Sequence, residues 1–430
     1  MRQVKESMER RAKRAPKGLD LSGAKQRGVE REEGGLCSAV GHALQEIRGK
    51  RPFIISRASY PGLGHYAGHW TGDILSTWEE MRMTIPAMLS FNLFGIPMVG
   101  ADICGFGGRT TPELCKRWMQ LGAFYPFSRN HADNQQPDHD PAAFTADVVE
   151  AVKKAYRIRY TLLPYYYTLF WRAHVDGETV ARPLFFEYYG YDRLYPIDDQ
   201  FLIGKHVMIT PILKENATTT RPFFPGPHKF YNFVDGRFLA SGDYYNVSDD
   251  EIVSVRSGAV IPLQQPAMSG PVTTTNCRSR PLQLIATPVQ ILWQDNVAKG
   301  ELYWDDGDSL NSYEEKKYSH IEFTLKDNEL QSYVKWWGYG VPSVNNITIF
   351  GLKPIESVTL NNRNVDFIYK YHTQVLTVEN LNLSLDKPFK LTWHYPVAED
   401  DKDEDDEKYN KQHSKTVDCV NNEKPCTIND

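Results

Sequence analysis

An alternation of short apolar runs and amphipathic segments between residues 52 and 175 constrains the fold more than any other feature of the sequence. The apolar runs predict strands over 52–56, 94–99 and 123–127, and each is followed by a helix-like pattern. Strands that alternate with helices pair in parallel through right-handed crossovers. The sequence therefore predicts an α/β unit whose strands all end at one edge.

The helices of this unit can be placed from their caps and apolar faces. Leu36 and Ile47 fall on the expected core face of a helix that precedes the first strand. Ser76 and Glu79 have the spacing of a capping box before the second helix. Helices are expected over 36–48, 76–89 and 111–121, and a long helical region is expected from 142 to 175.

After Pro183 the sequence changes to short apolar runs separated by turns such as Pro225-Gly-Pro. This pattern is typical of antiparallel β structure. We expect one β domain over 181–265 and a second over 266–396, the latter with a strand near 290–293.

The composition and the two termini of the chain indicate which kinds of partner are not expected. The formal net charge of −5 gives no global sign of nucleic-acid binding. No apolar run is long enough to span a membrane, and the charged start lacks the apolar core of a signal peptide. Residues 1–35 and the tail over 397–430, which begins with an acidic run, are expected to be disordered.

Cysteines and sequons bear on the cellular compartment. Cys104 and Cys115 are close enough in sequence to close one loop, and in an oxidising compartment a disulfide is favoured there over a catalytic thiol. Four Asn-x-Ser/Thr sequons are candidate glycosylation sites in a secreted chain. They are Asn216, Asn246, Asn346 and Asn382.

Polar side chains follow each of the three predicted strands. Arg57 follows the first strand, Asp102 the second, and Arg129 and His131 the third. In an α/β barrel the carboxyl ends of the strands form the active face, so these side chains are expected to converge. Each residue taken singly is also explained by a structural role, and it is the convergence that favours a binding site.

The loop over 57–73 is rich in glycine and aromatic residues and contains Trp70 and Asp73. Glycoside hydrolysis requires two carboxyl groups, one to protonate the leaving oxygen and one to attack or to activate water. Aromatic neighbours would desolvate Asp73 and raise its pKa toward the working pH. Asp73 is therefore the candidate acid, and Asp102 is the other carboxylate at a strand end.

A metal site in the same loop is not expected. His65, His69 and Asp73 have the four-residue spacing of a metal-binding helix face, but a glycine precedes each of them. Each such glycine costs a helix about 1 kcal/mol relative to alanine, so the segment is predicted to be a loop. No cofactor is expected either.

Three motifs resemble glycoside hydrolase family 31: His69-Trp-Thr-Gly-Asp73, Gly100-Ala-Asp-Ile-Cys-Gly-Phe106 and Arg117-Trp-Met-Gln-Leu-Gly-Ala-Phe-Tyr-Pro-Phe-Ser-Arg-Asn-His131. The likeness extends from about residue 36 to 396. It implies the carboxyl-terminal part of a (β/α)8 barrel over 36–180, followed by a proximal and a distal antiparallel β-sandwich. It also implies a retaining α-glucosidase that releases terminal non-reducing glucose from malto-oligosaccharides or glycogen.

The resemblance assigns roles to individual residues. Asp73 matches the general acid/base of the family, and Cys104 and Cys115 match a family disulfide. The expected partner is an α-glucoside oligosaccharide or polysaccharide, and the expected location is the lysosome or the secretory pathway. The residues that match the subsite for the non-reducing glucose are Arg57, Trp70, Asp102, Phe106, Arg129 and His131.

The sequence departs from the family at the nucleophile, an aspartate in a Trp-x-Asp-Met-Asn-Glu motif upstream of the first strand, which does not occur here. The chain is therefore expected to be the carboxyl-terminal portion of an α-glucosidase or a truncated gene model, with any signal peptide on the missing part. Two hypotheses stay open: an α-glucosidase that needs a nucleophile from elsewhere, and an inactive fragment or carbohydrate-binding pseudoenzyme. We expect the isolated chain to be poorly soluble and inactive.

Overall fold

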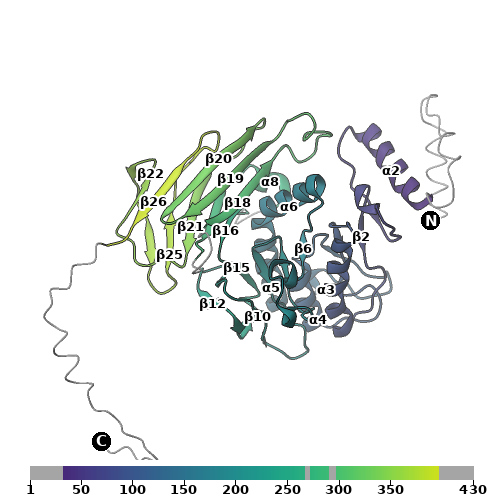
Figure 1. Ribbon diagram of the computed structural model, residues 1–430. Coiled ribbons are helices and arrows are strands. Elements are labelled where there is room, and N and C mark those ends of the chain that lie inside the picture. The colour runs from purple at the N-terminus through teal and green to yellow at the C-terminus, as the bar shows by residue number, and fades with distance from the viewer. Residues whose placement is uncertain (1–31, 267–271, 290–296, 397–430) are drawn as a thin grey trace, which may run out of the picture.

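The computed structural model describes residues 32–266, 272–289 and 297–396. An α/β part built from the amino-terminal half lies beside a large curled sheet formed by the carboxyl-terminal half (Figure 1). A smaller sheet lies between them in sequence and packs against the helices of the α/β part. Within these ranges no helix is long and apolar enough to cross a membrane.

The strands of the α/β part are parallel, as predicted. β1 (Ile55–Ser56) pairs with β2 (Gly68–Trp70), and β2 pairs with β3 (Val99–Gly100). β4 (Asp102–Ile103) pairs with β5 (Arg129–Asn130). The parallel strands and intervening helices are those of a partial (β/α) barrel.

The positions of these strands differ from the prediction in two places. β2 lies inside the segment that was predicted to be a loop. A Cβ atom added to Gly68 would come within 2.6 Å of the Met98 carbonyl oxygen, just before β3. Glycine at this position therefore permits the close approach of β3. Residues 123–127 form turns rather than a strand, because Phe124 and Tyr125 donate to the last carbonyl groups of the preceding helix. A short apolar run does not by itself distinguish a buried turn from a strand.

The helices follow their predicted positions with small shifts. α3 (Trp78–Leu93) is capped by Thr77, one residue after the predicted cap Ser76. The Glu80 backbone amide donates a 3.1 Å hydrogen bond to the Thr77 hydroxyl oxygen. α4 (Pro112–Gly122) is capped by Thr111. The predicted long helical region is two helices, α5 (Ala146–Thr161) and α6 (Leu163–Asp176), because Pro164 interrupts the hydrogen-bond pattern at their junction.

The first helix, α2 (Glu32–Arg48), begins four residues before its predicted start at residue 36, within the predicted charged leader. Its predicted core face is wrong for two residues, since Leu36 is 57% exposed and Ile47 is 81% exposed. Phe53, between α2 and β1, is 62% exposed, and β1 has a strand neighbour on one side only among the described elements. This edge of the α/β part therefore combines an unpaired strand edge with exposed apolar side chains, which favours association.

We expect this edge to dominate the solution behaviour of the isolated chain. A double substitution, Ile47→Ser with Phe53→Ser, should raise the soluble fraction and lower the fluorescence of a hydrophobic dye, because it removes the apolar surface without touching a core. Tyr371→Ser removes a comparably exposed ring on the large carboxyl-terminal sheet, and it should change neither the soluble fraction nor the dye fluorescence. Equal dye binding by the parent and the double variant would contradict this account.

The smaller sheet is antiparallel and has the order β12-β11-β15-β8-β7-β6. Its strands are β6 (Ala181–Arg182), β7 (Phe201–Ile203), β8 (Val207–Ile209), β11 (Phe230–Asn232), β12 (Phe238–Ala240) and β15 (Val253–Arg256). Two short ribbons accompany it, formed by β9 (Thr219–Thr220) with β14 (Val247–Ser248), and by β10 (Phe223–Phe224) with β13 (Asp243–Tyr244). Its apolar face joins the core of the α/β part, so the two form one packed unit.

The large sheet has eleven strands and its own apolar core. It is antiparallel except for the pairs β16–β18 and β17–β21. β16, which precedes the predicted domain boundary at 265, pairs within this sheet, so the two sheets divide between Arg256 and Ala259.

The predicted strand at 290–293, like residues 1–31 and 397–430, lies outside the described residues. The strands are β16 (Ala259–Gln264), β17 (Leu282–Thr287), β18 (Val297–Trp304), β19 (Ser319–Lys326), β20 (Glu329–Trp337), β21 (Val344–Phe350), β22 (Ser357–Leu360), β23 (Arg363–Asn364), β24 (Ile368–Lys370), β25 (Val375–Val378) and β26 (Lys390–His394).

Candidate active site

β4 and β5 begin with Asp102 and Arg129 and bring these two residues together. The two residues are directly paired in register, and Arg129 Nη2 donates a hydrogen bond to Asp102 Oδ1. Asp102 is fully buried, and its other carboxylate oxygen has no hydrogen-bond partner among the described residues. A buried carboxylate oxygen without a donor costs free energy, so this site has an unmet demand for a hydroxyl or N–H group.

Several predicted site residues act electrostatically on Asp102. Burial raises the pKa of its carboxyl, the ion pair with Arg129 and the nearby His131 lower it, and the nearby Asp73 raises it further. The net direction is upward. The structure thus places Asp73, from the loop after β2, and Arg129 and His131, from β5 and the residue after it, around the buried Asp102.

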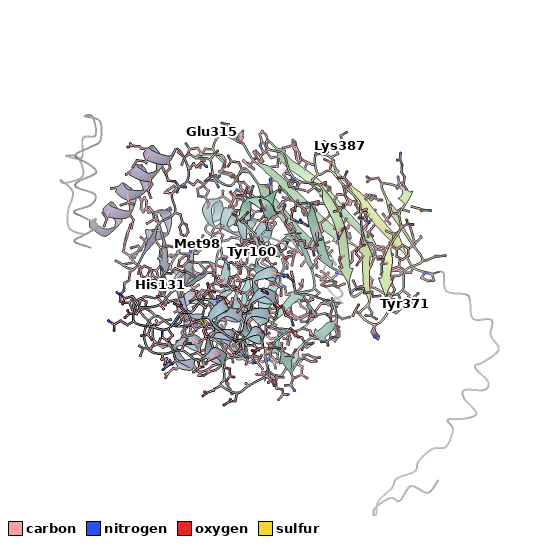
Figure 2. All side chains as sticks on the ribbon, turned by 180° about the vertical axis from the view of Figure 1, so that it is seen from behind. Met98, His131, Tyr160, Glu315, Tyr371 and Lys387 are labelled. Atoms are coloured by element: carbon pink, nitrogen blue, oxygen red, sulfur yellow. A yellow bond between two sulfur atoms is a disulfide. The ribbon has the colours of Figure 1, made fainter. Side chains whose placement is uncertain are left out.

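Aromatic rings surround this ion pair. The Arg129 guanidinium carbon lies 5.2 Å from the ring centroid of Trp70 and 5.5 Å from that of Phe127. The rings of Phe106 and His131 lie 5.3 Å apart, with Phe106 half-buried and His131 exposed. Figure 2 shows His131 on the α/β part, far from Tyr371 and Lys387 of the large sheet. Aromatic faces beside charged hydrogen-bonding groups are typical of sugar-binding sites.

Asp73 follows β2 and faces Arg57, which follows β1. Its Oδ2 lies 3.4 Å from Arg57 Nη1, and the Asp73 side chain is 45% exposed. The prediction that aromatic neighbours desolvate the Asp73 carboxylate is therefore wrong. The carboxylate is partly exposed, and its charged contact is the exposed side chain of Arg57. Gly72, with a φ of 82°, allows the approach, because an added Cβ would lie 3.1 Å from Arg57 Nε.

The Cys104–Cys115 disulfide is present and joins the end of β4 to α4. It borders the turn that carries Phe106 toward the site. Cys104 and Gly105 both have left-handed φ values, and an added Cβ on Gly105 would come within 2.5 Å of Ser76 Cα. Glycine at this position therefore lets the Phe106 loop pack against the start of α3. Cys37 and Cys277 are buried free thiols.

Two residues that shape the site were not singled out for it by the sequence. His69 in β2 is buried, and its Nδ1 lies 2.9 Å from the Ser56 carbonyl oxygen in β1, while burial lowers the pKa of its ring. Arg159 in α5 donates to the carbonyl groups of Ala123 and Tyr125 at 2.7 and 2.6 Å, which fixes the turn before β5. Single polar residues in a helix or strand carry no pattern that reveals such roles.

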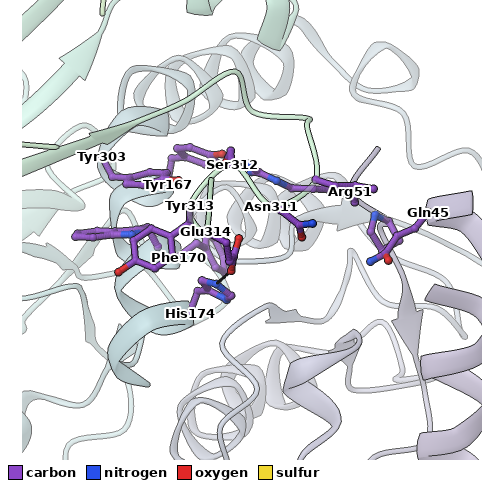
Figure 3. A pocket seen from close by; sticks show the side chains of 13 residues that line it. Gln45, Arg51, Tyr167, Phe170, His174, Tyr303, Asn311, Ser312, Tyr313 and Glu314 are labelled. Carbon is purple, nitrogen blue, oxygen red and sulfur yellow. Dashed lines mark hydrogen bonds and ion pairs between the residues drawn. The ribbon is translucent and has the colours of Figure 1, made fainter. Parts of the chain in front are cut away.

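A hollow of about 290 Å³ lies elsewhere, between α6, residues 45–52 and the loop over 310–314 (Figure 3). His174 and Glu314 lie 3.6 Å apart in it. None of the predicted site residues lines it. Beside it Arg51 donates to the buried Asp305, which ties the start of β1 to the large sheet.

Comparisons with known proteins agree with the fold. The model "Glycosyl hydrolases family 31 TIM-barrel domain" matches residues 26–169, and "Glycosyl hydrolase family 31 C-terminal domain" matches residues 177–261. Among relatives, rat lysosomal alpha-glucosidase is 39% identical over 388 residues, which is 84% of this chain and 40% of that protein. Human intestinal sucrase-isomaltase is 38% identical over 384 residues, 85% of this chain and 20% of that protein.

Solved structures give the same result. The glucosidase II alpha subunit in its alpha3-Glc2-bound form matches with a TM-score of 0.76 and 26% identity, over 84% of this chain and 42% of that one. A Flavobacterium johnsoniae dextranase complexed with glucose matches in fold with a TM-score of 0.74 at 22% identity, over 85% of this chain and 49% of that one.

The parallel strands and the intervening helices define the class as a protein with a (β/α)-barrel domain. Within that class the chain belongs to glycoside hydrolase family 31, as the two family matches and the α-glucosidase relatives show. It spans at most 40% of the length of the curated relatives described above.

Proposed function

We propose that this chain carries the acid/base half of a retaining α-glucosidase site, acting on terminal α-linked glucose of malto-oligosaccharides or glycogen. The observation that carries the proposal is the buried Asp102–Arg129 pair beside Trp70, with Asp73 one strand away. The relatives named as lysosomal alpha-glucosidase and sucrase-isomaltase support the substrate class. The lysosome or the secretory pathway is the proposed location.

Each residue has a distinct role in this proposal. Asp73 protonates the glycosidic oxygen as the bond breaks and then accepts a proton from the incoming water. Its exposed position beside Arg57 suits a group that must exchange protons with solvent between the two steps. Asp102 and Arg129 accept from and donate to the hydroxyl groups of the glucose, while Trp70, Phe106 and His131 bound the pocket.

The nucleophile is a separate requirement. A retaining site needs a second carboxylate about 5–5.5 Å from the acid/base, free to attack the anomeric carbon. Asp102 is poorly suited, because it is buried and one of its oxygens is engaged by Arg129. The proposal therefore assigns the nucleophile to a carboxylate that the described residues do not include.

The exposed edge at Phe53 favours the second candidate, an inactive fragment or carbohydrate-binding pseudoenzyme, for the chain on its own. The deciding experiment joins residues 36–430 behind the upstream part of a family member that contains the Trp-x-Asp-Met-Asn-Glu motif, giving a completed barrel. We expect glucose release from maltose by the completed barrel and none by the chain alone. Clear hydrolysis by the purified chain alone would contradict the need for an added nucleophile.

A further inference from the structure

Asn246, one of the four sequon asparagines, lies in a surface recess. Asn246 is exposed between β13 and β14 and forms one wall of a recess of about 530 Å³, whose other walls are Arg221, Tyr244 and Tyr245. The recess is open to solvent, so a group attached to the side-chain amide of Asn246 would begin beside the other three side chains.

Tyr244 supplies an apolar face to this recess. Its side chain is 49% exposed, yet its ring lies 5.1 Å from the buried ring of Phe223, its register partner in β10. This contact holds the tyrosine in one place while leaving part of it open. A held aromatic ring offers a rigid apolar surface at low entropic cost, as the C–H face of a sugar ring requires.

Arg221 supplies hydrogen-bond donors to the same recess. Its guanidinium carbon lies 5.6 Å from the ring centroid of Tyr244. Over the ranges that the structure describes, the guanidinium makes no hydrogen bond and no ion pair, so its five N–H groups are available. The N-acetyl carbonyl oxygen of N-acetylglucosamine, the first sugar of an N-linked glycan, is an acceptor that such a group can bind.

The other sequons provide comparison sites. Asn346 lies within β21, is half-buried, and its amide oxygen accepts a 3.2 Å hydrogen bond from Asn345. Asn216, in a turn, and Asn382, beside the isolated bridge residue Leu383, are both exposed and have left-handed φ values of 59° and 43°.

We propose that Asn246 carries an N-linked glycan whose first N-acetylglucosamine packs against Tyr244 and accepts a hydrogen bond from Arg221. Transfer from a lipid-linked diphosphate donor forms the bond between Asn246 Nδ2 and C1 of the sugar. The C1–O bond to the diphosphate breaks, the diphosphate leaves with the electron pair, and the amide loses one proton to a base. This inference does not depend on the hydrolytic activity proposed above.

The test uses the full chain placed behind a secretory signal in cells that attach high-mannose glycans. Glycopeptide mass spectrometry gives the occupancy of Asn246. Release by peptide-N-glycosidase in isotopically labelled water then marks each freed site as a labelled aspartate, so the rates at Asn246 and Asn382 are measured in one native molecule. We expect release at Asn246 to be about tenfold slower, because tenfold corresponds to about 1.4 kcal/mol of packing. If Asn382 is unoccupied, Asn216 serves as the comparison site.

Matched variants distinguish packing from general crowding. Tyr244→Ala and Arg221→Gln should each speed release at Asn246 and leave Asn382 unchanged, whereas Tyr371→Ala, at an exposed tyrosine on the large sheet (Figure 2), should change neither. Arg221→Gln removes no buried contact. Its release rate therefore tests the proposal even if Tyr244→Ala disturbs the fold. An unmodified Asn246, equal native rates at the two sites, or unchanged rates in both recess variants would overturn the proposal.

Discussion

Asp73→Asn in the completed barrel should lower kcat/KM for maltose by a factor of about 10²–10⁴, the contribution typical of a positioned general acid/base. Asparagine keeps the size and the approach to Arg57 but has no proton to give to the leaving oxygen. The change should appear in kcat, since the side chain acts as the bond breaks and not when the sugar binds. Initial rates of glucose release, measured on the variant and the parent at equal folded concentration, check this.

The substrate dependence of the loss separates an acid/base from a structural residue. An aryl α-glucoside with a good leaving group needs little protonation, so its glycosylation step should survive Asp73→Asn far better than that of maltose. Azide needs no base to attack the covalent glycosyl-enzyme intermediate, so it should speed turnover of the aryl substrate and yield α-glucosyl azide. Equal losses on both substrates with no azide effect would show that Asp73 is structural.

Glu79→Gln is the matched control for this experiment. Glu79 is an exposed carboxylate in the first turn of α3, six residues from Asp73, and within the described part of the chain it makes no hydrogen bond or ion pair with a site residue. Its replacement should leave both substrates within about twofold of the parent, because surface substitutions usually change stability by no more than about 0.5 kcal/mol.

Asp305→Asn should destabilise the chain by about 3 kcal/mol, because it removes one partner of a buried ion pair. Asp305 is fully buried and accepts from Arg51, from Tyr167 at 2.5 Å and from Ser312 at 2.5 Å. Arg51 is about one-third exposed and can recover some hydration, so the lower end of the usual 3–5 kcal/mol range applies. Urea unfolding should show a lower midpoint with an unchanged slope.

The same effect should depend on pH. Burial alone would raise the pKa of Asp305, but hydrogen bonds from Ser312, Tyr167 and Arg51 outweigh it and lower the pKa below its ordinary value of 3.8. A carboxyl with a lowered pKa in the folded state contributes stability above 3.8 and loses it as the pH falls through the folded value. The difference between parent and Asp305→Asn should therefore be full at pH 6 and shrink below pH 3.8.

The neighbouring ion pair Lys50–Asp308 provides the control, since it joins the same two segments at the surface. Asp308→Asn should cost no more than about 1 kcal/mol, as is usual for exposed pairs. A loss for Asp305→Asn no larger than that for Asp308→Asn would show that burial adds nothing at this junction.

Much of the fold was predictable because local patterns report it directly. The existence of α3 and α4 and their buried faces follow from residue spacing. α3 begins two residues and α4 one residue after its expected start, and the cap of α3 is Thr77 rather than Ser76. β2 was missed because three residues between glycines give no periodic signal. The assignment of β16 to the large sheet was missed because strand partners are chosen by contacts distant in sequence.

By itself the sequence determined the α/β class, the parallel direction of the strands, the disulfide and the family, since these depend on local periodicity and on long motifs. Only the tertiary structure decided that Asp102 is buried against Arg129, that Asp73 is exposed, and that Leu36, Ile47 and Phe53 lie on an uncovered edge. Burial and charge pairing depend on which segments meet in space, and a linear pattern of residue types does not contain that information.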